Sequence, residues 1–112
     1  MDDIFGSAQR ASGFLKALAN ENRLVILCTL AEGEKNVGEL EIVLGIRQPT
    51  LSQQLARLRA DELVATRRDS KQIYYSLASK EAEQVIGLLY ELFCAEGAAQ
   101  AKGKTQDKAE AA

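Results

Sequence analysis

The sequence predicts a small, mainly α-helical domain with one β-hairpin, and three neighbouring segments support this fold class. Residues 37–44 have the apolar content of a short helix, and Gly45 follows as a residue type that commonly ends helices. Residues 48–58 form a second helical pattern shortly afterwards, and residues 64–77 alternate like two strands around polar turn residues. Helix, tight turn, helix and hairpin make up a winged helix-turn-helix, which places one helix in the major groove of DNA.

Three further helices are expected around this unit, which makes about five in all. Ser7 is a suitable cap for the first, whose apolar residues have the spacing of a one-sided helix: Ala11, Phe14, Leu15 and Leu18. Asn20 is a good N-cap for the second, at residues 21–31. Ser79 is expected to cap a long last helix, residues 80–97, which is apolar on more than one face. Such a helix needs a partner besides its own core, so we expect a homodimer.

Chain length limits the organisation to one domain. The protein has 112 residues, and none of its apolar stretches approaches the roughly 18 residues of a membrane span. The N-terminus lacks the basic and apolar segments of a secretion signal. We therefore expect a cytoplasmic protein with no membrane partner, whose thiols are kept reduced. Residues 1–97 are expected to form the folded domain and residues 98–112, which have no large apolar side chain, a flexible polar tail.

The helix at 48–58 carries the residues expected to read DNA. We expect Gln48 to cap it and Pro49 to occupy its first helical position, with three leucines turned inward: Leu51, Leu55 and Leu58. The candidates for the groove are Gln48, Thr50, Ser52, Gln53 and Arg57. Glutamine pairs with adenine, hydroxyl groups reach bases or phosphates, and arginine reaches guanine or phosphate. The alternative is a polar helix face that only meets water.

The hairpin is the second expected DNA contact, and the charge distribution supports it. Three basic residues flank its tip, where they would meet phosphates or a minor groove: Arg67, Arg68 and Lys71. The formal net charge is −2, which by itself disfavours nucleic acid. Residues 45–75, however, hold six basic and three acidic side chains, whereas the rest of the chain holds eight and thirteen. A basic face on an acidic body suits a DNA-binding protein, although a randomly charged surface is the alternative.

Two cysteines, Cys28 and Cys94, are the other candidates for chemistry. A lone cysteine on an apolar stripe is more often a small buried hydrophobe than a reactive group. Zinc normally takes four ligands from Cys, His and carboxylate, and the chain has no histidine. There is no Cys-x-x-Cys pair, and a thiol enzyme would lack a histidine base. We therefore expect no metal site, no cofactor and no catalytic residue.

Taken together, three segments resemble the ArsR/SmtB family of winged-helix repressors. They are Leu18–Leu30 (LANENRLVILCTL), Leu51–Leu58 (LSQQLARL) and Ile73–Leu77 (IYYSL). The resemblance covers about residues 8–97. The family's recognition helix commonly contains Ser-x-His-Leu, and here Gln54 replaces the histidine. The family's metal sites, a Cys-x-Cys before the turn and a histidine-bearing set on the last helix, have no counterpart in this sequence.

One subgroup of the family, the persulfide sensors, is similar at both cysteines. Cys28 stands in an Ile-Leu-Cys setting and Cys94 near the end of the last helix, and residues 47–60 also look like that subgroup. The resemblance implies a homodimer that binds double-stranded operator DNA when reduced and represses sulfide-oxidation or related genes. Reactive sulfur species, as inducer, would bridge the two thiols of one subunit with a polysulfide and weaken DNA binding.

The same switch has a plain physical form. A thiolate attacks a sulfur donor, and the second cysteine closes a bridge by exchange. A bridge between Cys28 and Cys94 would tie the core to the last helix and shift the recognition helices, which must lie about 34–36 Å apart. A gap too long for one S–S bond would admit a polysulfide and exclude a disulfide. One alternative is a thiol-based repressor that responds to peroxide or to a soft metal ion. Another is a winged-helix protein-interaction module that binds no DNA.

Overall fold

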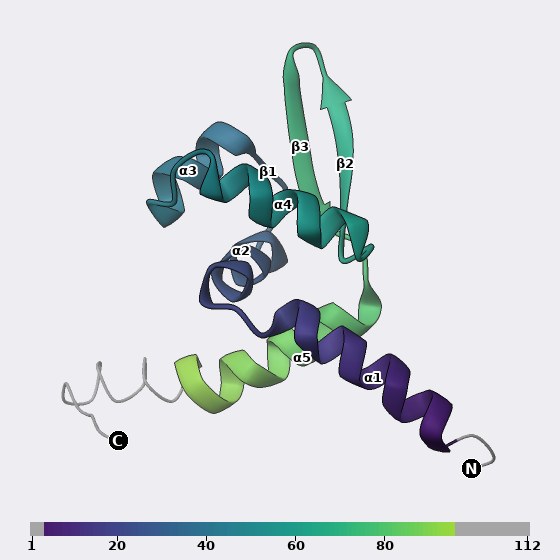
Figure 1. The fold of residues 1–112 in the computed structure, drawn as a ribbon. Helices are drawn as coiled ribbons and strands as arrows, with labels where there is room; N and C mark the ends of the chain where they lie inside the picture. The colour runs from purple at the N-terminus through teal and green to yellow at the C-terminus, as the bar shows by residue number, and fades with distance from the viewer. Residues whose placement is uncertain (1–3, 96–112) are drawn as a thin grey trace, which may run out of the picture.

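The computed structural model describes residues 4–95, which form a helical body with a projecting hairpin (Figure 1). Its elements are α1 (Ile4–Leu18), α2 (Glu21–Ala31), β1 (Lys35–Asn36), α3 (Val37–Leu44), α4 (Thr50–Ala60), β2 (Val64–Asp69), β3 (Gln72–Leu77), α5 (Lys80–Leu89) and a π-helical segment (Tyr90–Ala95). The winged helix-turn-helix with five α-helices is confirmed.

The core lies where α2, α3 and α4 meet the base of the hairpin and the start of α5. Its largest fully buried side chains are Ile26, Leu27, Leu40, Leu51, Leu55, Leu58 and Ile86. The expected inward turn of the three α4 leucines is confirmed. Because these leucines hold one face of α4 against the body, the opposite face of the same helix remains available for a partner.

Local capping explains where most helices begin and end. Asn20 caps α2 by accepting a hydrogen bond from the backbone N–H of Arg23 at 3.0 Å, as expected. Asn36 and Glu39 form a reciprocal capping box at the start of α3. Gly45 ends α3 with φ of +70°, a left-handed conformation that glycine adopts without the steric cost of a side chain. The predicted cap of α5, Ser79, accepts from the N–H of Ala82.

The sheet has three strands in the order β1-β3-β2, one more than the predicted hairpin. The extra strand is β1, in which Lys35 pairs with Tyr75 and Asn36 with Tyr74. A two-residue strand contains no alternation for a sequence pattern to reveal, because its existence depends on the partner strand. The wing itself is antiparallel from the Val64–Leu77 pair to the Asp69–Gln72 pair.

The first turn of α4 differs from the prediction. The helix begins at Thr50, so Pro49 occupies the capping position instead of the first helical one. Gln48 still caps the helix from one residue further out, because its Oε1 accepts from the N–H of Ser52 at 3.2 Å and also from the Ser52 hydroxyl. The turn between α3 and α4 is consequently one residue longer than expected.

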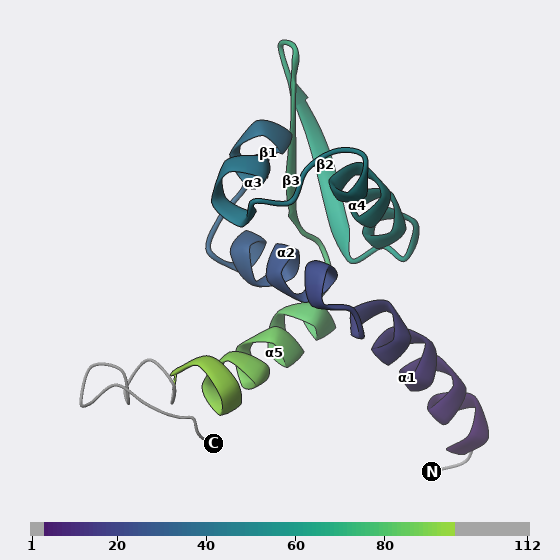
Figure 2. The same ribbon diagram turned by 60° about the vertical axis from the view of Figure 1, so that its left-hand side comes forward.

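The first and last helices extend away from the body as two arms. Both α1 and α5 lie on the side of α2 opposite the hairpin and diverge in opposite directions (Figure 2). The helix α1 begins at Ile4 rather than after Ser7, and of its expected stripe Leu18 is buried and Phe14 half-buried while Ala11 and Leu15 are exposed. A helix that leaves the body cannot bury its full stripe within one chain.

The last helix changes its type before its expected end. Regular α-helix ends at Leu89 and continues as the π-helical segment, whereas residues 96–97 and the predicted tail at 98–112 lie outside the described residues. Large apolar side chains are exposed on both arms: Ile4, Phe5, Leu15, Leu88, Tyr90, Leu92 and Phe93. Within residues 4–95, the structure has no helix long and apolar enough to cross a membrane.

Candidate DNA interface and thiol pair

The residues expected to read DNA all lie on the outer side of α4 and its preceding turn. All five side chains are exposed: Gln48, Thr50, Ser52, Gln53 and Arg57. This placement follows from the heptad-like spacing of the buried leucines, which leaves the polar residues on the opposite face. Gln48 already hydrogen bonds to Ser52, and Arg57 pairs with Asp61 at 2.8 Å. Such exposed contacts are weak enough to be exchanged for contacts with a partner.

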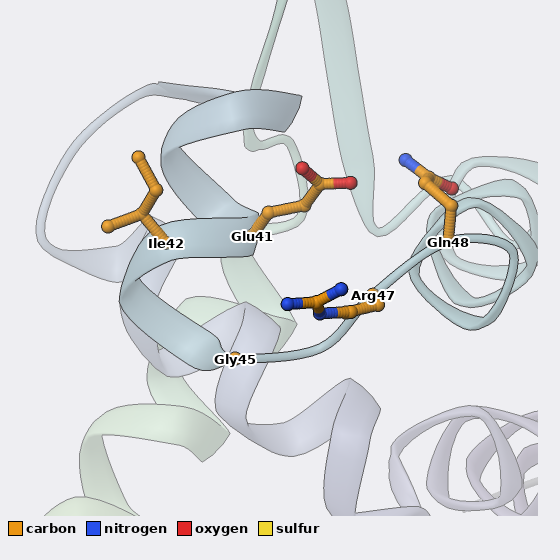
Figure 3. Close-up of a pocket in the computed structure, with 5 residues that line it drawn as sticks. All are labelled: Glu41, Ile42, Gly45, Arg47 and Gln48. Carbon is orange, nitrogen blue, oxygen red and sulfur yellow. The ribbon is translucent and has the colours of Figure 1, made fainter.

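An open cavity of about 590 Å³ lies between α3 and the start of α4. It is lined by Glu41, Ile42, Gly45, Arg47 and Gln48, and Figure 3 shows Glu41 and Arg47 pointing into the space between the two elements. The guanidinium of Arg47 therefore adds a basic group to the space between α3 and the start of α4, which the carboxylate of Glu41 also enters. Arg47 is one of the basic residues of the segment 45–75, but its position in a turn gives no helical-face pattern that would mark it as a DNA contact.

On the wing, the side chain of Arg67 is engaged in contacts within the protein. Its guanidinium donates to both carboxylate oxygens of Glu34, at 2.6 and 2.8 Å, and lies over the ring of Tyr74 at 4.7 Å from the centroid. The hydrogen bond from Arg67 lowers the pKa of Glu34, and the same contact raises the pKa of Arg67. Sequence analysis missed Glu34, which lies in the loop before β1 and far from Arg67 along the chain.

The other two wing bases are placed nearer the tip. Arg68 donates through Nε to the backbone carbonyl of Ser70 at 3.3 Å, and Lys71 is exposed in the turn that joins β2 and β3. The structure thus separates the three predicted phosphate contacts into two groups. Arg67 is held by an acidic residue at the base of the sheet, whereas Arg68 and Lys71 lie at the tip.

The two cysteines are both free thiols, in different surroundings. Cys28 is half-buried on α2 and packs against the core, whereas Cys94 is exposed in the π-helical segment. Burial raises the pKa of the Cys28 thiol, and the negative charges of Cys94 and then of Glu32 raise it further. The packing of α2 against α5 brings the helix of Cys28 next to the helix that leads to Cys94, although the two residues are distant along the chain.

The local helix type at Cys94 was not predicted. Tyr90–Ala95 is π-helical, a rare conformation that often occurs at functional sites, whereas an ordinary α-helix was expected through residue 97. The wider turn rotates the side chains that follow Leu89 relative to a continuous α-helix. Among the described residues, no group of three or more His, Cys, Asp and Glu side chains is arranged to hold a metal ion.

One further residue with a structural role was not identified from the sequence. Arg23 on α2 is buried, and its guanidinium reaches Gln54 of α4, the residue that replaces the histidine of the Ser-x-His-Leu pattern. The available signal was a basic residue next to the apolar stripe of α2. That signal is weak, because arginine at such a position usually extends into solvent.

Comparison with known proteins gives consistent matches. Residues 20–66 match the family described as "Bacterial regulatory protein, arsR family". The chain is 58% identical over 81 residues to the biofilm growth-associated repressor of Agrobacterium fabrum, covering 72% of this chain and 69% of that protein. It is 48% identical over 95 residues to the protein of the same name from Xylella fastidiosa, covering 85% of this chain and 83% of that protein.

Two solved structures are similar over nearly their full length. The reduced form of HlyU from Vibrio cholerae superposes with a TM-score of 0.80 at 44% identity, covering 84% of this chain and 99% of that one. The transcriptional repressor BigR from Xylella fastidiosa gives a TM-score of 0.77 at 48% identity, covering 85% of this chain and 94% of that one. The likeness therefore extends to the domain as a whole.

Proposed function

The chain is a transcriptional regulator that belongs to the arsR family of bacterial regulatory proteins, and from that premise we propose that it is a homodimeric, thiol-switched repressor. In this proposal the reduced protein binds double-stranded operator DNA. Reactive sulfur species bridge Cys28 and Cys94 of one subunit, and the bridged protein releases the operator.

The observation that carries the proposal is that one half-buried and one exposed thiol from distant parts of the chain stand on elements that pack together. Cys94 is open to solvent, where a sulfur donor can reach it, and its charge acts on Cys28 in the core. Cys28 and Cys94 stand on elements that pack together, because α2 packs against α5 and α5 leads into the segment of Cys94. This packing supports exchange chemistry, which requires the two sulfurs to approach each other.

DNA binding by α4 and the wing tip supports the other half of the proposal. The predicted readers are exposed on one helix face, and Arg68 and Lys71 lie at the end of a hairpin that projects beyond that helix (Figure 1). Hydroxyl and amide side chains on the helix suit base edges, and the basic tip suits phosphates. Arg47 adds a further positive charge beside the start of α4.

The bridging reaction balances with an organic persulfide, RSSH, as the only oxidant. Each cysteine thiolate attacks the outer sulfur of one RSSH, which breaks the RS–SH bond and releases RS⁻ as RSH. The persulfide anion on Cys94 then attacks the inner sulfur of the Cys28 persulfide, and HS⁻ leaves as H₂S. The products are one trisulfide bridge, two RSH and one H₂S, so the donor sulfur is reduced as the two thiols are oxidised.

A bridge would act on DNA binding through α2. This helix packs against α5 on one side and against α4 on another. The helix α4, which carries the residues expected to contact DNA, is called the reader helix. Joining Cys28 to the π-helical segment would therefore fix the C-terminal arm relative to α2, the helix that supports the reader helix. Allosteric coupling of about 1–3 kcal/mol changes affinity roughly 5- to 150-fold, so a small displacement of α4 is sufficient.

The test combines intact-protein mass spectrometry with a DNA gel shift. Reduced protein is treated with glutathione persulfide or, separately, with hydrogen peroxide, and each sample is probed with a promoter fragment. We expect the persulfide to insert sulfur between Cys28 and Cys94 and to abolish the shift, and the variants Cys28→Ser and Cys94→Ser to bind DNA without responding.

Other outcomes separate the alternatives. A plain disulfide and loss of binding with peroxide would instead identify a general oxidant sensor. Loss of binding with a soft metal ion in the absence of persulfide would identify a metal-responsive repressor. If the reduced protein shifted no DNA fragment, the winged helix would be a protein-interaction module and the proposal would be wrong.

A further inference from the structure

The buried side chain of Arg23 connects three helices. Among the described residues, Arg23 is the one charged side chain in the core, with 9% of its surface exposed. Its Nε donates to the carbonyl of Ala17 at 2.6 Å, and its Nη2 to the carbonyl of Lys16 at 3.2 Å. Its Nη1 donates to Oε1 of Gln54 at 2.9 Å. One guanidinium on α2 thus binds both the end of α1 and the middle of α4.

The carbonyls at the end of α1 orient the guanidinium of Arg23. Lys16 and Ala17 belong to the last turn of α1, where backbone carbonyls lack the regular helical partner, although the carbonyl of Lys16 also accepts from the N–H of Ala19 at 3.3 Å. A cation is also favourable at that end of a helix dipole. Because a guanidinium is planar and its N–H groups form a rigid fork, the two carbonyls fix the direction of the remaining nitrogen. The end of α1 therefore determines where Arg23 holds Gln54.

The hydrogen bond from Arg23 makes the two adjacent glutamines of α4 differ in their availability to a partner. Gln53 is exposed on the reader face, whereas Gln54 is half-buried and accepts from Arg23. Gln54 is thereby withdrawn from the set of polar side chains that face outward. Its role in the structure is to attach the reader helix to the arm.

The same helix, α2, carries both Arg23 and Cys28. Five residues of α-helix separate them by about 7.5 Å along the axis and about 140° around it, so they lie on different faces. One face of α2 thus carries Cys28, and another holds the contact between α1 and α4.

We propose that Arg23 is a positioning residue: by attaching Gln54 of α4 to the end of α1, it sets the distance between the two reader helices of the dimer. This inference rests on the proposed function, because it requires a dimer in which exposed apolar residues of the arms meet. Two half-sites demand reader helices about 34–36 Å apart, so a reader that is loose relative to its arm loses affinity for the correct spacing.

The test compares three duplexes in fluorescence-anisotropy titrations of the reduced, full-length protein. The first is an operator that the wild type selects from random-sequence DNA, the second has one base pair inserted between its half-sites, and the third contains a single half-site. The variant Gln54→Met keeps the length of the side chain and removes the acceptor. We expect it to bind the selected operator about 5- to 50-fold more weakly, the loss of one hydrogen bond in each subunit.

Two further readouts distinguish positioning from direct base contact. Gln54→Met should bind the single half-site as tightly as the wild type, and it should show a smaller penalty for the inserted base pair. Gln54→His, which returns a hydrogen-bond acceptor, should restore the wild-type penalty. The matched control Gln53→Met should weaken the half-site and the full operator together and leave the spacing penalty unchanged.

The opposite results would overturn the inference. If Gln54→Met weakened binding to the half-site and to the operator equally, Gln54 would be a base-reading residue. If the spacing penalty were unchanged, Arg23 would contribute to the stability of the fold and not to positioning. If Gln54→Met fails to fold, Arg23→Lys, which keeps the charge but lacks the fork, must show the same reduced spacing penalty. Failure of the proposed function is separate, because it appears in the wild type as an absence of selected operators or of a persulfide response.

Discussion

The reader half of the molecule, formed by α2, α3 and α4, and the two arms differ in how much of their apolar surface a single chain buries. In the reader half, α2, α3 and α4 enclose a core of leucine and isoleucine side chains that are almost fully buried. In the arms, only residues next to the body are buried: Ala17, Leu18, Ala82 and Ile86. Beyond them, α1 and the π-helical segment present large apolar residues to solvent, with Phe5 86% and Phe93 73% exposed.

The two halves therefore differ in where their apolar residues find partners. The leucine and isoleucine core of the reader half is buried within a single chain, whereas Ile42 and Val43 of α3 remain exposed. The arms carry apolar faces that a single chain leaves open, and a second copy of the same face would cover them. The thiols lie at the junction, with Cys28 on a reader helix and Cys94 on an arm.

The largest effect that would test this contrast is the loss of one reader leucine. Leu55 is 1% exposed, so Leu55→Ala should destabilise the protein by about 2–5 kcal/mol through lost burial and the cavity left behind. Urea denaturation at several protein concentrations provides the measurement. A cost below about 1 kcal/mol would mean that the reader core tolerates a cavity and is not the rigid half.

An arm residue should behave in the opposite way. Phe93→Asp should leave the helical content of a single chain unchanged, since that side chain is mostly exposed, but prevent dimerisation. Loss of the second reader would lower operator affinity by about 100-fold or more. Sedimentation equilibrium and operator titration measure the two effects. Ile42→Asp, at an exposed apolar residue of the reader half, is the control, and it should remain dimeric.

The two thiols should differ in reactivity as the two halves differ in exposure. Because burial and the charge of Cys94 raise the pKa of Cys28, we expect iodoacetamide at neutral pH to label Cys94 at least about tenfold faster. Peptide mass spectrometry over time measures both rates. In Cys94→Ser the pKa of Cys28 should fall, and its labelling should begin at lower pH. Unchanged labelling would show that the two thiols do not interact.

The raised pKa of Cys28 also has a consequence for stability. The folded state holds this proton more tightly than the unfolded chain does. The corresponding stability is present below the ordinary thiol pKa and is lost as the pH rises through the raised value. Cys28→Ser should remove that part of the alkaline loss of stability.

The smallest expected effect concerns the wing. In the proposed complex Glu34 would compete with DNA phosphate for Arg67, so Glu34→Gln should strengthen operator binding a few-fold and make its dependence on the logarithm of salt concentration steeper by about one for each subunit. Because Arg67 lowers the pKa of Glu34, their contact is present above the ordinary carboxylate pKa and is lost as the pH falls through the lowered value. Titrations at several salt concentrations measure the slope, with Glu41→Gln as the acidic control. Weaker binding by Glu34→Gln would show that the contact holds Arg67 in its working position.

Local signals in the sequence were sufficient for most of the fold. The caps at Asn20 and Ser79, the stop at Gly45 and the spacing of Leu51, Leu55 and Leu58 depend on residues within a few positions of one another. For that reason the helix-turn-helix, the wing and the exposed reader face could be predicted. The identity of the candidate thiols also came from the sequence, because each cysteine has a recognisable setting on its helix.

The remaining features were decided by contacts between distant segments. The strand β1 exists because β3 lies beside it, Arg67 is held because Glu34 comes close to the wing, and Gln54 turns inward because Arg23 meets it. The apolar stripe of α1 is only partly buried because the helix leaves the body. The sequence by itself determined which elements form and which faces they carry. Only the tertiary structure decided which side chains are available to a partner, because a hydrogen bond across the fold can occupy a residue whose local pattern marks it as free.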